Sequence, residues 1–266
     1  MPVDYKADIK EHHLKTASLF SGVGGLEIAT SAGMTAAFFC DSNADVRRVI
    51  KKRQQDGNLP QVPVYDDVAT IPDEALQEIE AMTAGFPCPD LSIAAERAGM
   101  AGTRSGLFRF VVINAAKAKK LKVLILENVG HLVSNDMKPA FVDMMRWLIC
   151  IDFVVIRWIV LTASAVGKPH ERKRWFCLAT RRTADLDYLA QAFPGLSPDD
   201  IQNLAKTPWE TNGVPLHEWL CAEYTDENKS RLEMMGNAVV PLCANSAIRV
   251  LANMYVKPVK PQHVVT

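Results

Sequence analysis

The sequence has no charge excess, no paired cysteines and no low-complexity segment. Its 30 basic residues balance 30 acidic residues, so a nucleic acid could be bound only through local clusters of charge. The six cysteines are scattered and do not show the short paired spacings of a zinc site. We therefore expect no metal ion, and free thiols in a reducing compartment.

The sequence also lacks a long uninterrupted apolar run. Its most apolar long segment, Met144 to Val166, contains Arg146, Asp152 and Arg157, each of which would cost about 2.5 kcal/mol or more at the centre of a bilayer. The segment Met1 to Lys15 is polar and charged, unlike a secretory signal. We expect an intracellular monomer that acts without a membrane, in the cytoplasm or, in a eukaryotic host, the nucleus.

The 266 residues are 48% hydrophobic, which is sufficient for one large globular core. From residue 16, short apolar runs alternate with segments that have helical apolar spacing. Candidate strands are 16–20, 36–40, 81–85, 122–126, 153–161 and 175–179, and candidate helices are 25–32, 44–55, 109–120, 138–151 and 236–255. This alternation predicts a doubly wound α/β fold, with a mostly parallel sheet and helices on both faces. Residues 181–230 show no clear periodicity, so we expect a separate insert there.

A glycine-rich turn, Ser18 to Gly25, follows the first candidate strand and opens a helix. In α/β folds this position binds nucleotide-like ligands, although such a turn can also be a simple tight connection. Asp41 ends the second strand, where it could bind ribose hydroxyls, and Asp67 could meet an adenine amine. Either aspartate alone is more typical of a turn or cap. Together with the glycines they predict an adenosine-type pocket.

Three further segments carry reactive or charged side chains. Cys88 follows the strand 81–85 between two prolines, and this stiff loop is a poor core element but can aim a thiol. Glu127 ends the next strand and would lie beside Cys88 in a continuous sheet. Arg172 and Arg174 alternate at the start of a strand, so both project to one side, as catalytic groups or as a solvated edge.

The order and spacing of these blocks resemble the DNA (cytosine-5)-methyltransferase family from residue 16 to 255, except for 181–230. The most specific parts are Gly85-Phe86-Pro87-Cys88, Glu127-Asn128-Val129, the arginine pair and residues 231–241. The resemblance implies a Rossmann-like S-adenosylmethionine-dependent methyltransferase fold. Residues 14–180 with 231–256 would form the catalytic domain, and 181–230 a short target-recognition region.

The resemblance also implies the reaction, transfer of a methyl group from S-adenosylmethionine to carbon 5 of a cytosine flipped out of double-stranded DNA. Cys88 would attack carbon 6, Glu127 would act at N3, and Arg174 would hold O2 and orient Glu127, with Arg172 beside it. Burial should raise the pKa of Glu127 whereas Arg174 should lower it, and the sequence leaves open which effect is larger.

The residues expected to bind the cofactor surround one pocket at the strand ends: Phe20, Gly22, Val23, Gly24, Gly25, Asp41, Ser42, Asp67, Val68, Pro87, Leu107, Asn237 and Val239. The segment 89–107 resembles the family's mobile loop, which closes over the flipped base. Contacts to DNA are expected from Ser92, Arg97, Arg104 and Lys173.

The chain departs from the family pattern at Pro89 and His170, which stand where glutamines are usual, and in the shortness of 181–230. Alternatives therefore stay open. A tRNA cytosine-5 methyltransferase of the same superfamily usually carries a Cys-Phe-Thr segment, which 181–230 lacks. A catalytically inactive cofactor-binding or scaffold member would not need Cys88, Glu127 and Arg174. An NAD-dependent dehydrogenase shares only the glycine-rich start.

Overall fold

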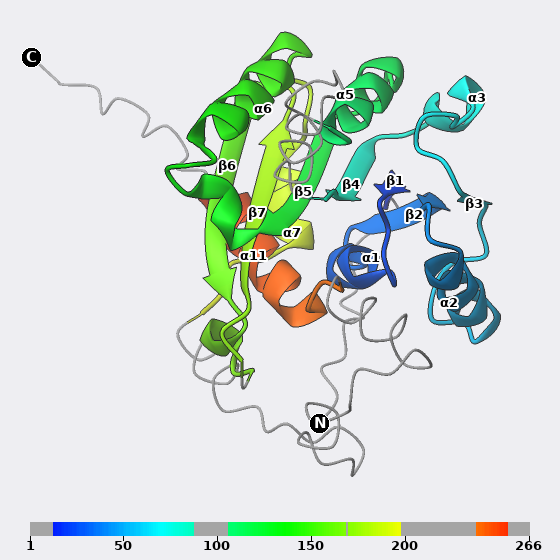
Figure 1. The fold of residues 1–266 in the computed structure, drawn as a ribbon, viewed down its shortest axis with the longest axis horizontal. Coiled ribbons are helices and arrows are strands. Elements are labelled where there is room, and N and C mark those ends of the chain that lie inside the picture. Colours follow the sequence, from blue (N-terminus) through cyan, green and yellow to red (C-terminus); the bar gives the residue numbers. More distant parts are fainter. Residues whose placement is uncertain (1–12, 88–105, 169, 198–237, 255–266) are drawn as a thin grey trace, which may run out of the picture.

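The computed structural model describes residues 13–87, 106–168, 170–197 and 238–254. Their strands form one seven-stranded sheet with the order β3-β2-β1-β4-β5-β7-β6 (Figure 1). The strands are β1 Leu14–Leu19, β2 Met34–Cys40, β3 Val64–Tyr65, β4 Ala81–Gly85, β5 Val123–Val129, β6 Val155–Thr162 and β7 Lys173–Thr180. The pairs from β3 to β5 are parallel, and β7 runs antiparallel to β5 and β6. The predicted mostly parallel α/β sheet is confirmed.

Helices connect the strands as the alternating pattern predicts. They are α1 Gly25–Thr30, α2 Ala44–Gln55, α3 Asp73–Leu76, α5 Phe108–Lys117, α6 Lys138–Cys150, α7 Leu186–Ala192 and α11 Pro241–Asn253, with 3-10 turns η1 Gly130–Val133 and η2 Ser164–Val166. The start of α2 shows the local cause. The Asn43 side chain accepts hydrogen bonds from the backbone N–H groups of Asp45 and Val46, which satisfies two donors that the helix leaves unpaired.

The alternation of side chains along each strand divides the apolar core into layers on the two faces of the sheet. Met82 and Leu124 contribute to the layer that includes residues of α5 and α6. Their neighbours Ala81 and Val123 contribute to the layer that includes residues of α1, α7 and α11. Helices therefore cover both faces, as Figure 1 shows.

Helix α7 is an element that the sequence pattern does not indicate. It packs in the same apolar layer as α11, and the Tyr188 hydroxyl donates a hydrogen bond to the Gly33 carbonyl at 2.6 Å. The chain therefore continues along the body of the α/β fold for at least one helix after β7. Among the helices of the described residues, none combines the length and the apolar content needed to cross a membrane.

The order of the strands determines where a ligand can reach the sheet. Strands β1 and β4 are neighbours, with β2 and β3 on one side of them and β5 on the other. The connections from β1 and from β4 therefore leave in opposite directions, and in α/β folds ligands bind in a crevice at the carboxyl ends of the strands at such a switch point. The glycine-rich turn after β1, Pro87 after β4 and Glu127 near the end of β5 all belong to this edge.

Candidate active site at the carboxyl ends of the strands

The glycine-rich turn between β1 and α1 has backbone angles that require its glycines. Gly22 and Gly24 have φ angles of 52° and 83°, in the left-handed region. A Cβ atom on Gly22 would meet no atom of the described residues within 4 Å, so that part of the chain leaves open space in front of Gly22. In contrast, a Cβ on Gly25 would lie 2.8 Å from the Val239 carbonyl oxygen, which brings two expected cofactor residues together.

An aspartate joins this turn to the end of β2. Asp41 Oδ2 accepts a hydrogen bond from the Gly22 N–H at 2.9 Å, and Oδ1 accepts one from the Asn43 N–H at 2.9 Å. Each carboxylate oxygen keeps a further lone pair, which a ribose hydroxyl could use. The open space at Gly22 and this acceptor beside it fit an adenosine-type cofactor such as S-adenosylmethionine.

The other expected cofactor residues that the structure describes differ in their exposure. Asp67 is exposed, and its Oδ1 accepts the Ala69 N–H at 2.8 Å, so it also serves as a turn residue. Val68 is buried, and its carbonyl accepts a hydrogen bond from Asn114 of α5. Phe20 and Val23 are half-buried in the turn, Ser42 and Pro87 are exposed, and Leu107, next to α5, is 42% exposed.

The centre of the site is a buried ion pair between Glu127 and Arg174. Arg174 Nε lies 2.9 Å from Glu127 Oε1, and the two side chains are 15% and 7% exposed. The pairing of β5 with β7 places Glu127 opposite Phe176, two residues from Arg174, so both side chains lie on one face of the sheet. A Cβ on Gly85 would lie 3.3 Å from Glu127 Oε2, so the glycine leaves room for the carboxyl.

Burial has a larger effect on the pKa of Glu127 than the arginines have, a balance that the sequence leaves open. Loss of solvent raises the pKa to about 7, although Arg174 and then Arg172 lower it. A carboxyl with a pKa near neutrality can both donate and accept a proton under physiological conditions.

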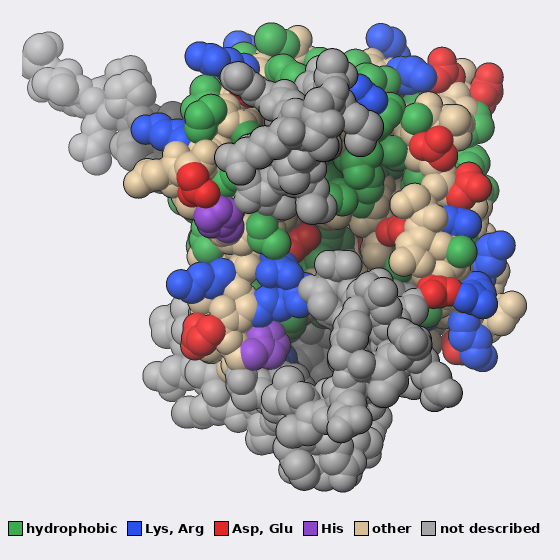
Figure 2. All heavy atoms as spheres, viewed as in Figure 1, with side chains coloured by type: hydrophobic (Ala, Val, Ile, Leu, Met, Phe, Trp, Pro, Cys, Tyr) green, Lys and Arg blue, Asp and Glu red, His purple; other side chains and the backbone are tan. Residues whose placement is uncertain are grey.

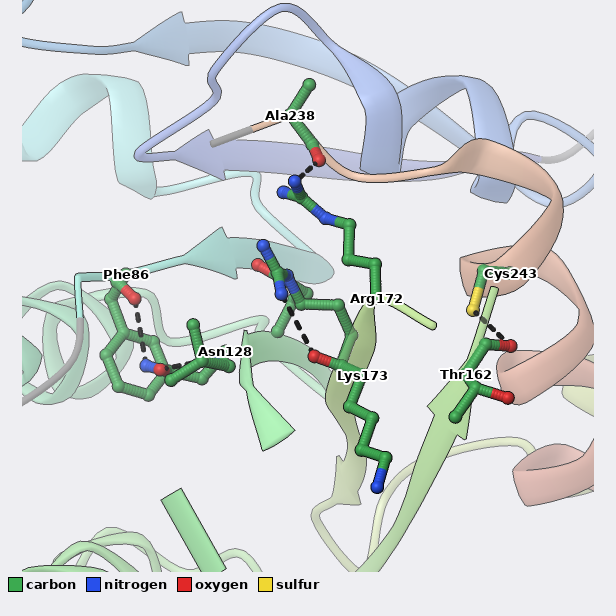
Figure 3. Close-up of polar contacts among 10 residues, drawn as sticks. Phe86, Asn128, Thr162, Arg172, Lys173, Ala238 and Cys243 are labelled. Atoms are coloured by element: carbon green, nitrogen blue, oxygen red, sulfur yellow. Dashed lines mark hydrogen bonds and ion pairs between the residues drawn. The ribbon is translucent and has the colours of Figure 1, made fainter. Parts of the chain in front are cut away.

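Arg172 lies just before β7 and connects it to the segment before α11. Its Nη2 donates a hydrogen bond to the Ala238 carbonyl at 2.7 Å, as Figure 3 shows. The neighbouring Lys173 is exposed, and its carbonyl accepts a hydrogen bond from Arg174 at 2.9 Å. Figure 3 also shows a thiol near this site, Cys243, which lies 3.8 Å from the Thr162 carbonyl oxygen. Burial raises the pKa of Cys243 to about 12, so it is a poor nucleophile.

The site also has a positively charged rim, which consists of Lys168, Arg172, Lys173 and Arg174. Figure 2 shows Lys, Arg and His side chains close together on one face of the molecule, with Asp and Glu side chains among them. His170 has a lowered pKa because it is partly desolvated and because Arg172 and Lys168 are close to it. A concentration of positive charge of this kind attracts phosphate groups.

Asn128 fixes the start of the segment that leads to Cys88. Its buried amide donates a hydrogen bond to the Phe86 carbonyl at 2.9 Å, and its Oδ1 accepts the Val129 N–H at 2.8 Å. Sequence reasoning included Asn128 only as part of a motif. The buried Glu27 carries no signal in the sequence, because a single charged residue in a candidate helix is usually solvated.

Five expected site residues lie outside the described residues: Cys88, Ser92, Arg97, Arg104 and Asn237. The same holds for Pro89 and for residues 198–230. The described residues nevertheless bring together Gly22 with Asp41, Gly25 with Val239, and Glu127 with Arg172 and Arg174.

Comparison with known proteins finds one family model, described as C-5 cytosine-specific DNA methylase, that matches residues 14–229. Type II methyltransferase M.CviJI of Paramecium bursaria Chlorella virus IL3A is 30% identical over 234 residues, which are 85% of this chain and 56% of that protein. Type II methyltransferase M.NgoBV of Neisseria gonorrhoeae is 31% identical over 225 residues, 79% of this chain and 51% of its own. The chain thus spans about half the length of the curated relatives it matches.

Among solved structures, a mutant of Spodoptera frugiperda DNMT2 has a TM-score of 0.50 and 20% sequence identity. The similarity covers 65% of this chain and 51% of that one. It supports the α/β fold, independently of the residues at the site.

Proposed function

The chain belongs to the C-5 cytosine-specific DNA methylase family, and on that premise we propose that it transfers a methyl group from S-adenosylmethionine to carbon 5 of a cytosine in double-stranded DNA. The observation that carries the proposal is the buried Glu127–Arg174 pair, with its 2.9 Å contact. In the pairing of β4 with β5, Glu127 lies opposite Gly85. Gly85 is three residues before Cys88 in the sequence.

The Cys88 thiolate would start the reaction by forming a bond to carbon 6 of the cytosine. Carbon 5 of cytosine is a poor nucleophile, and addition at carbon 6 makes it an enamine carbon that can attack an electrophile. S-Adenosylmethionine, when bound, supplies the methyl group on a sulfonium centre. After transfer, a base or water removes the proton from carbon 5, and the Cys88 thiolate leaves as the 5,6 double bond re-forms.

Glu127 would stabilise the first step by holding a proton at N3 of the cytosine ring. Negative charge develops on the ring as the thiolate adds, and a proton or hydrogen bond at N3 neutralises it. The pKa of about 7 supports this role, because the group can be protonated before addition and can lose the proton afterwards. Arg174 would orient this carboxyl and hold the cytosine O2.

The turn after β1 would hold the cofactor. Gly22 leaves open space, and Asp41 offers carboxylate oxygens beside it. Asp67, Val68 and Val239 would complete the pocket, together with the other residues expected at the strand ends.

The DNA substrate must present its cytosine outside the helix, because a stacked and paired base cannot meet a cysteine and a carboxyl at the same time. The positive rim that includes Lys173 and Arg172 would contact backbone phosphates, and Ser92, Arg97 and Arg104 would add contacts. Residues 14–180 with 231–256 would form the catalytic domain, and 181–230 would contribute target recognition. We propose further that the protein acts as a monomer inside the cell, where DNA is found.

Bisulfite sequencing of DNA from cells that express the chain tests this function. We expect new 5-methylcytosine at a defined sequence, absent from cells that express Cys88→Ser. In a parallel assay, labelled S-adenosylmethionine is incubated with the purified protein and either DNA or tRNA. Label in DNA supports the proposal, label in tRNA alone supports the tRNA methyltransferase, and label in neither excludes both.

A further inference from the structure

A second carboxyl, Glu27, is buried beneath the glycine-rich turn. It lies in the first turn of α1 and is 7% exposed. The Thr83 hydroxyl of β4 donates a hydrogen bond to Glu27 Oε1 at 2.7 Å. The other oxygen, Oε2, is also buried, and within the described part of the chain it has no hydrogen-bond partner.

Within the described residues, the side chains that act on Glu27 carry hydroxyls and are not cations. Burial raises its pKa, and the groups that oppose this effect are Ser18 and Thr83. The pKa is raised because a negative charge buried beside hydroxyls is costly.

The hydroxyl contacts extend from Glu27 to the ends of two further strands. The Ser18 hydroxyl of β1 donates to Ser21 Oγ at 2.7 Å, and Ser21 Oγ accepts the Cys40 N–H of β2 at 3.0 Å. Thr83 lies two residues before Gly85, on the strand that leads to Cys88. The start of α1 is thus connected to the strand ends on both sides of the crevice.

We propose that Glu27 is a positioning residue of the cofactor site: through its hydrogen bond with Thr83 it holds the glycine-rich turn, residues 20–25, at a fixed position relative to β4. This inference rests on the proposed function, because it concerns the pocket for S-adenosylmethionine. The turn supplies the open space at Gly22, and a shift of α1 away from β4 would move that space with it. Glu27 itself acts through the turn and is not assigned a contact with the ligand.

Thr83→Val and Thr30→Val form a matched pair of variants that tests the proposal. Both threonines are buried to the same extent, and each substitution removes one hydroxyl while keeping the β-branched shape. Thr83→Val removes the bond to Glu27, whereas the bonds of the Thr30 hydroxyl within the described residues go to carbonyls of its own helix, at Leu26 and Glu27. The readout is the dissociation constant for S-adenosylmethionine, measured by calorimetry on the full chain without DNA.

We expect Thr83→Val to weaken binding about tenfold, because it leaves a buried carboxyl oxygen without its donor. Thr30→Val should remain within about twofold of the wild type. Glu27→Gln keeps the shape and the acceptor oxygen, so it should restore most of the affinity that Glu27→Leu loses. Melting temperatures, measured in parallel, identify any variant that fails to fold.

The results separate this inference from the proposed function. If the wild type does not bind S-adenosylmethionine, the proposed function fails. If the wild type binds and Thr83→Val binds equally well, only the role of Glu27 is refuted. Equal losses in Thr83→Val and Thr30→Val would also refute it, because the effect would then reflect general loss of stability.

Discussion

The candidate site has a cofactor half, at the turn after β1, and a second half around Glu127. Each half contains one buried carboxyl, and the two carboxyls differ in their partners. Glu27, below the glycine-rich turn, accepts a hydrogen bond from the Thr83 hydroxyl, whereas Glu127, near the end of β5, pairs with the Arg174 guanidinium. Burial raises the pKa of both. The arginines limit the rise for Glu127 to about 7, which leaves a group able to exchange a proton near neutral pH.

Burial alone therefore does not determine what a carboxyl can do. A buried acid held by a hydroxyl is suited to fixing the position of a turn, because a hydrogen bond holds its two partners at a short and defined distance. An acid whose pKa is raised by desolvation and lowered by two guanidiniums is suited to proton transfer. Variants at the Glu127 half should therefore change the rate of methyl transfer, and variants at the turn should change cofactor affinity or stability.

Arg174→Ala should have the largest effect, a loss of about 10³-fold in the rate of methyl transfer to DNA. The change removes the proposed contact to the cytosine O2 and also the partner that lowers the pKa of Glu127. Arg146→Ala is the control, because Arg146 forms an exposed pair with Asp143 of the same helix. A similar loss in both variants would mean that the assay reports general damage.

Glu127→Gln should slow transfer by about 10²-fold or more while changing DNA and cofactor affinity little. The amide keeps the size of the side chain but cannot supply a proton to N3. Glu78→Gln is the matched control, since Glu78 forms an exposed pair with Lys120. A Glu127→Gln protein with the wild-type transfer rate would remove the distinction between the two carboxyls.

Gly25→Ala should lower stability by about 1–3 kcal/mol, because its Cβ would lie 2.8 Å from the Val239 carbonyl oxygen. The loss should appear as a melting temperature reduced by several degrees, together with weaker binding of S-adenosylmethionine. Gly195→Ala is the control, because a Cβ there would make only ordinary contacts, the nearest at 3.5 Å. Equal melting temperatures for the two variants would show that the turn tolerates a shift of Val239.

The smallest effect is a pH dependence of stability caused by Glu127. Its pKa is raised from 4.5 to about 7 in the folded protein, so the folded state binds more protons than the unfolded state between these values. The stability that this protonation contributes is fully present below the lower value and is lost as the pH rises through the higher one. The melting temperature of Glu127→Gln, compared with that of the wild type, should therefore increase between about pH 5 and about pH 7 and then level off. A constant difference would show that the pKa of Glu127 is not raised.

Much of the fold follows from the sequence, because strands buried on both faces are read directly from apolar runs. The candidate strand 81–85 and the candidate helix 44–55 have the same limits as β4 and α2. The reversed direction of β7 between β5 and β6 could not be read in this way, since strand order depends on how distant segments pair. The short α7 was missed because seven residues give too few turns for a periodic signal.

The candidate site, like the fold, could be predicted only in part from the sequence. The positions of Asp41 and Glu127 at strand ends follow from the alternation of elements, and the resemblance identifies Arg174. The balance between burial and attraction at Glu127 depends on tertiary packing, which the sequence does not give. Glu27 shows the same limit, because its partner Thr83 is 56 residues away in the chain.

The most direct test of the central claim, that Cys88 attacks a cytosine in DNA with help from Glu127, uses DNA that contains 5-fluorocytosine. Fluorine cannot leave carbon 5 as a proton does, so the enzyme should remain bound to the DNA through Cys88 once the methyl group is transferred. With S-adenosylmethionine present, we expect the wild type to form a denaturation-resistant complex, Glu127→Gln to form it slowly, and Cys88→Ser to form none. Absence of the complex with the wild type, or its formation by Cys88→Ser, would contradict this account.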